Sequence, residues 1–132
     1  MITQPELTAE LASALQSFAA IEREIVMLGA QADADKAHRL VQLRRQLVLE
    51  FARVRDALEA EPSMLCSPEL MTAAMRQLAA FRTSNAINQA DWPVVRVRDN
   101  PAEYRVASRS VGEASRLFWG WTEQHLGFRA EL

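Results

Sequence analysis

Few side chains in this sequence are suited to catalysis or to metal binding. The candidate ligands and nucleophiles are two histidines, His38 and His125, and a single cysteine, Cys66. Metal-binding helical bundles use inward-facing carboxylates and Glu-x-x-His pairs. Here Asp35 precedes His38 by three residues, but Glu123 and His125 have the wrong spacing. No glycine-rich phosphate loop occurs either. We therefore expect no metal site, no cofactor and no enzymatic activity.

A second set of polar residues occupies positions where apolar residues are expected. Asn85 and Asn88 continue a helical seam that begins at Met71. In a hairpin with the following helix, Asn88 would face the level of Ala107 and Asn85 that of Val111. Ser108 would lie close by, and Tyr104 one level above. Three interpretations stay open. Asn85, Asn88, Tyr104 and Ser108 could form a polar ligand pocket, they could form a buried layer that fixes helix register, or the helices could open there to water. We expect Asn85 to be more buried than an average asparagine.

Arginines gather on the same C-terminal part of the chain. Arg105, Arg109 and Arg116 share one helical face, and Arg96 and Arg98 precede it. Acidic residues are interspersed, so a solvated face is the favoured interpretation. Binding of an anion or of an acidic partner is the alternative.

Four segments position these residues. Each carries apolar residues at alternating steps of three and four, which is typical of one buried helix face. With their caps and prolines, the predicted helices run from Thr3 to Gly29, from Asp33 or Asp35 to Ala60, from Ser67 to Trp92, and from Pro101 to Phe128. Residues 64–66 are predicted to form a loop that tucks apolar side chains over the core, and residues 94–98 an extended or irregular link. The fold class is therefore all-α: an antiparallel four-helix bundle with a short irregular link before the last helix, forming a single domain over residues 1–132.

The second half of the last helix is apolar around most of its circumference. Phe118 and Trp121 lie on its main stripe and are expected in the core. Leu117, Trp119 and Leu126 lie off that stripe and need separate cover. We interpret these three as partner-binding residues, because an exposed tryptophan beside a leucine is typical of an association hot spot.

Composition excludes several classes of protein. The net charge of −2 gives no support for nucleic-acid binding. No apolar run approaches the roughly 20 residues of a membrane span, and the N-terminus does not resemble a signal peptide. Every basic residue except Lys36 is arginine, which suggests a GC-rich bacterial genome. We expect a soluble cytoplasmic protein.

The layout of the chain resembles the small helical export chaperones of the bacterial flagellum. The similar features are a long first helix ending in residues 21–28 (IEREIVML), an arginine-rich second helix, and residues 82–85 (RTSN) before a late amphipathic helix. The tryptophan-rich end is not a feature of that family. The resemblance implies cytoplasmic capture of a helical segment of an export substrate.

Three classes of function follow. The favoured one is an adaptor or chaperone-like protein that binds a helical partner through an apolar helix face. The second is a small-molecule-binding or regulatory bundle with a polar pocket near Asn85 and Asn88. The third is a structural homodimer in which the aromatic helix is its own interface. A protein partner or a second copy of the chain is therefore expected.

Overall fold

The computed structural model describes residues 7–29 and 34–130 of the chain. Within these ranges all regular secondary structure is helical, which confirms the predicted all-α class. The helices are α1 (Ala9–Gly29), α2 (Ala34–Ala60), α3 (Pro62–Leu65), α4 (Pro68–Asp91), α5 (Val94–Asp99), α6 (Pro101–Ala107) and α7 (Arg109–Leu126). None of the helices in this described part is both long enough and apolar enough to cross a membrane.

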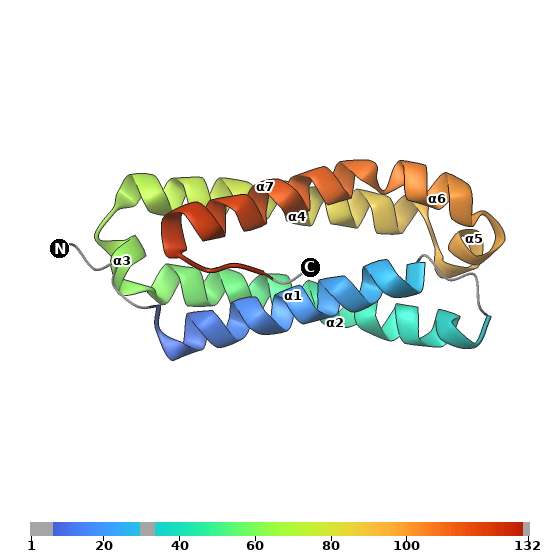
Figure 1. The fold of residues 1–132 in the computed structure, drawn as a ribbon, viewed down its shortest axis with the longest axis horizontal. Coiled ribbons are helices and arrows are strands. Elements are labelled where there is room, and N and C mark those ends of the chain that lie inside the picture. The colour runs from blue at the N-terminus through green and yellow to red at the C-terminus, as the bar shows by residue number, and fades with distance from the viewer. Residues whose placement is uncertain (1–6, 30–33, 131–132) are drawn as a thin grey trace.

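The four longest helices lie side by side along the long axis of the molecule (Figure 1). α1 packs on α2, α4 packs on α7, and α2 also contacts α4. The chain turns at α3 at one end and through α5 and α6 at the other (Figure 1). After α7, residues 127–130 run back between the two helix pairs (Figure 1).

Side-chain caps fix the starts of α1 and α4. The Oγ1 atom of Thr8 accepts a hydrogen bond from the backbone N–H of Leu11 at 3.3 Å. Ser67 Oγ accepts from the N–H of Leu70 at the same distance, as the sequence predicted. The predicted cap at Thr3 and the link through residues 30–33 lie outside the described residues. Leu7 was predicted to be helical, but it lies before the cap and is not.

Residues 62–65 form a short helix, where a loop was predicted for 64–66. Pro62 takes the first helical position, and the N–H of Leu65 donates to the carbonyl of Glu61 at 3.0 Å. Met64 is fully buried, as expected of an apolar side chain over the core. Leu65 and Cys66 are instead exposed, because one helical turn can direct only one of its faces inward.

The link at residues 94–98 is helical and not extended. The carbonyl of Pro93 accepts from the N–H groups of Arg96 at 2.9 Å and of Val97 at 3.1 Å. Val97 packs with Leu40, Trp92 and Tyr104, a set that we call the end cluster. The strand propensity of consecutive valines is a weak preference, and burial of Val97 in this cluster outweighs it.

The last predicted helix is broken at Ser108 into α6 and α7 and ends before Phe128. Serine is a weaker helix former than alanine, and the hydroxyl of Ser110 donates to the carbonyl of Ala107 at 3.5 Å in competition with the backbone. Gly127 ends α7 with a φ of 68°, a left-handed conformation that favours glycine.

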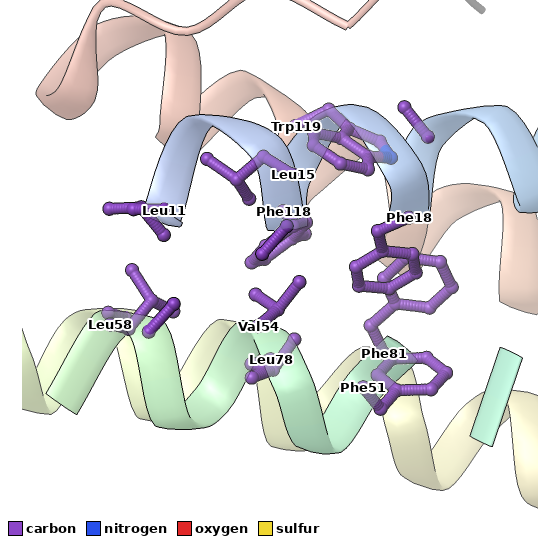
Figure 2. Packing of buried hydrophobic residues seen from close by; sticks show 14 of the residues in the cluster. Leu11, Leu15, Phe18, Phe51, Val54, Leu58, Leu78, Phe81, Phe118 and Trp119 are labelled. Carbon is purple, nitrogen blue, oxygen red and sulfur yellow. The ribbon is translucent and has the colours of Figure 1, made fainter. Parts of the chain in front are cut away.

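The core centres on five rings contributed by the four long helices (Figure 2). The ring of Phe18 lies 4.8 Å from that of Phe51, 5.5 Å from those of Phe81 and Trp119, and 5.9 Å from that of Phe118. We call these five residues the aromatic cluster. Phe118 and Trp121 are buried, which confirms their predicted place in the core.

Candidate functional site

A cavity of about 370 Å³ lies between α1, α2, α4 and the α6–α7 segment. We call it the central cavity. Its apolar walls are Ile25, Val26, Leu47, Phe81 and Val111. A mainly apolar cavity with a few converging polar groups is the usual form of a small-molecule site. Its volume is sufficient for a small organic molecule.

The four residues predicted to form a polar pocket all line this cavity. They are Asn85, Asn88, Tyr104 and Ser108. Asn85 is 8% exposed, which confirms its expected burial. The Nδ2 of Asn88 donates to Ser108 Oγ at 3.3 Å, so Asn88 faces the residue next to Ala107, the level predicted for it. This bond also joins α4 to the α6–α7 segment, so the residues contribute to helix packing as well.

Arg44 is a member of the site that sequence analysis did not identify. Its side chain is on α2, lines the central cavity and is 8% exposed. Nη1 donates to the backbone carbonyl of Trp92 at 2.7 Å. Nε and Nη2 are buried and have no hydrogen-bond partner among the residues that the structure describes. Within the described residues, no carboxylate forms an ion pair with Arg44.

Glu22, on α1, is a buried acid in the wall of the same cavity. Its Oε2 accepts from the hydroxyl of Ser115, and its Oε1 accepts from Trp119 Nε1 at 2.7 Å. Burial raises the pKa of the Glu22 carboxyl, and the two hydrogen bonds offset part of that rise. Both oxygens are therefore already engaged by protein donors.

We expect the wild-type protein to lose stability as pH rises, because Glu22 ionises, and we expect Glu22→Gln to abolish this loss. The folded state keeps its proton above the ordinary glutamate pKa of about 4.3, at which the unfolded chain ionises. The folded state therefore binds more protons in the window from that pH up to the raised pKa, and stability falls as pH rises through it. Glutamine can still accept from Trp119 and can donate to Ser115, so the variant should be more stable than the wild type above this window.

Urea denaturation across this pH range measures the effect, with Glu113→Gln as the control because Glu113 is exposed on α7. An equal pH dependence in Glu22→Gln and the wild type would contradict the assignment.

Three exposed arginines border the central cavity from α6 and α7. They are Arg105, Arg109 and Arg116, and we call them the rim arginines. Positively charged side chains beside a cavity favour the approach of anions. The face that the sequence indicated therefore adjoins the site.

The three residues predicted to bind a partner do not share an exposed surface. Leu117 is 59% exposed, but Trp119 and Leu126 are 5% and 7% exposed. The prediction that Trp119 and Leu126 lie outside the core is wrong. Trp119 packs on Phe18, and the chain that returns after α7 places Phe128 6.0 Å from the Trp119 ring. Other residues of the same chain therefore shield Trp119 and Leu126 from solvent.

The described residues contain no group of three or more histidine, cysteine or acidic side chains placed to hold a metal ion. Cys66 is a free, exposed thiol. The place of His125 on the apolar stripe of the last helix predicts partial burial, but the residue is exposed, with its ring 5.4 Å from that of Trp121.

A signal for the overlooked residues is present in the sequence. Glu22 lies four residues after Phe18, and Arg44 lies four residues after Leu40. Each is also three residues before the next apolar member of its stripe, as Ser115 is before Phe118. A polar residue at such a position faces the interior, as Asn85 does.

No protein-family model matches this chain, and comparison with curated proteins and with solved structures finds no match to either.

Proposed function

We propose that the protein is a non-enzymatic small-molecule-binding protein, built as an antiparallel four-helix bundle, whose ligand occupies the central cavity. The observation that carries the proposal is the buried guanidinium of Arg44, with two unbonded nitrogens, in the wall of a mainly apolar cavity.

The energetics of Arg44 favour an occupant. Burying a charged group is costly when some of its N–H groups have no acceptor, because those groups lose their hydration without gaining a hydrogen bond. A ligand with an acceptor in the cavity would offset this penalty. Arg44 then serves as a binding group, and the folded protein is less stable when no ligand is bound.

The other walls suit the same role. Apolar side chains such as Leu47 and Phe81 can cover the body of a ligand, while the amides of Asn85 and Asn88 supply directional hydrogen bonds. The alternative of an adaptor that binds a helix through α7 has less support, since Trp119 and Leu126 are buried.

We expect a small probe to bind wild-type protein and to fail to bind Gly112→Leu. Gly112 lines the cavity, and a Cβ there would have its nearest neighbour at 3.6 Å, so leucine can enter the space. Gly120→Leu is the matched control on the same helix, because a Cβ at that position meets no atom within 4 Å. Both changes replace a helical glycine, so their effects on helix propensity are similar.

The probes are 4-phenylbutyrate, 4-phenylbutanamide and 4-phenylbutanol, which share one apolar body and differ in head group. Binding is measured by amide chemical-shift changes in ¹H–¹⁵N spectra. At least one probe should shift the signals of cavity residues in the wild type and in Gly120→Leu. Absence of binding by all three probes, or equal binding to Gly112→Leu, would overturn the proposal.

A further inference from the structure

We infer that the ligand of the central cavity is an apolar monocarboxylic acid, whose carboxylate accepts two parallel hydrogen bonds from Nε and Nη2 of Arg44. This inference rests on the proposed function and specifies the chemical class of the ligand. It follows from the geometry of Arg44, the charge of the surrounding walls and the polarity of the remaining space.

The free atoms of Arg44 form one continuous edge of the guanidinium group. Nη1 is already held by the Trp92 carbonyl at 2.7 Å, which fixes the plane of the group. The remaining unbonded atoms, Nε and Nη2, lie on the opposite side-on edge. Two N–H groups on one edge match the two oxygens of a carboxylate, and such bidentate pairs are among the strongest hydrogen-bonded contacts in proteins.

The charged groups in the cavity wall favour a ligand with one negative charge over a ligand with two. Arg44 is the buried cation of the cavity wall, and Glu22 in the same wall adds an acid and no free donor, because Ser115 and Trp119 already bond its oxygens. A doubly charged phosphate would lack a second buried cation and would lie near this carboxyl group. A monocarboxylate needs only the free edge of Arg44.

The rim arginines have a different role in this arrangement. Arg105, Arg109 and Arg116 are exposed, so solvent and salt screen their charges. They raise the rate at which an anion reaches the cavity, whereas the buried edge of Arg44 holds it there. The rest of the ligand lies against apolar walls that include Ile25 and Val111, so a mainly hydrocarbon body fits.

The experiment compares the three phenyl probes by isothermal titration calorimetry with wild type, Arg44→Lys, Arg44→Gln and Arg45→Lys. The acid should bind wild type at least about tenfold more tightly than the alcohol or the amide, since a hydrogen bond to a charged group adds appreciable affinity. Arg44→Lys keeps the positive charge but loses the two parallel N–H donors, so the preference for the acid should disappear. Arg45 is the exposed neighbour on the same helix, and its variant should behave as wild type.

A second measurement uses the unmodified protein and so does not depend on the folding of any Arg44 variant. In ¹H–¹⁵N spectra of the arginine side chains, 4-phenylbutyrate should shift the Nε–H signal of Arg44 by more than it shifts those of the rim arginines. Circular dichroism checks that the Arg44 variants are folded. If Arg44→Lys does not fold, Arg44→Gln takes its place in the comparison.

The binding results distinguish the assignment of a carboxylate ligand from the existence of the binding site. Equal binding of all three probes, abolished by Gly112→Leu, would leave the binding site in place and overturn the carboxylate assignment. A preference for the acid that survives in Arg44→Lys, with no shift of the Arg44 Nε–H, would also overturn it and assign the selectivity to the rim arginines. If no probe binds, both proposals fail.

Discussion

Phe18→Ala should lower the free energy of unfolding by about 3–5 kcal/mol, the range expected for truncating a fully buried phenylalanine. Phe18 is fully buried and contacts the other four rings of the aromatic cluster. These rings come from all four long helices, so the cavity left by the truncation is lined from every side (Figure 2). Rigid walls cannot collapse to fill it, which places the expected loss in the upper part of that range.

Urea denaturation followed by far-ultraviolet circular dichroism measures this loss. Leu117→Ala is the control, because Leu117 is an exposed apolar residue on α7. Its effect should stay within about 0.5 kcal/mol, as for most surface substitutions. Similar losses in the two variants would contradict the position of Phe18 at the centre of the core.

Trp119→Ala should also cost about 3–5 kcal/mol, because it removes a buried aromatic ring. It also removes the hydrogen bond from Nε1 to Glu22 at 2.7 Å and leaves a buried carboxyl oxygen without a donor. Trp119→Phe separates the two contributions, since it keeps an aromatic ring and loses the N–H. We expect this milder variant to lose about 1–3 kcal/mol, the cost of an unsatisfied buried polar group.

Trp121→Phe is the matched control for the hydrogen bond. Trp121 is also buried on α7, but in the described part of the chain its Nε1 has no hydrogen-bond partner. Replacing it should therefore cost less than replacing Trp119, and the difference between the two denaturation free energies reports the bond to Glu22. A larger loss at Trp121 would show that ring packing, and not this bond, determines both values.

Periodicity predicted the long helices well, because each must turn one apolar stripe toward the core. It could not predict α5, since the helical state of Val94–Asp99 depends on a contact between Val97 and residues distant in the sequence. The break at Ser108 likewise depends on weak local preferences that a strong apolar stripe conceals.

The site was partly predictable for a related reason. Asn85 and Asn88 were identified because an asparagine in an apolar seam is unusual and carries no charge that demands solvent. Arg44 and Glu22 occupy equivalent positions, but charged residues are ordinarily assigned to the surface. Trp119 was misplaced because its cover includes the chain that returns after α7, and helical periodicity contains no information about a tertiary contact of that kind.

The two apolar clusters imply that the molecule does not open uniformly. The end cluster has four buried members, whereas the larger core extends over all four long helices. Local opening requires less free energy where fewer apolar contacts must be broken. The α5–α6 end should therefore detach transiently while the aromatic cluster stays intact. Tyr104 belongs both to the end cluster and to the wall of the central cavity. Such breathing would give a molecule in solution a route to Arg44 that does not require global unfolding.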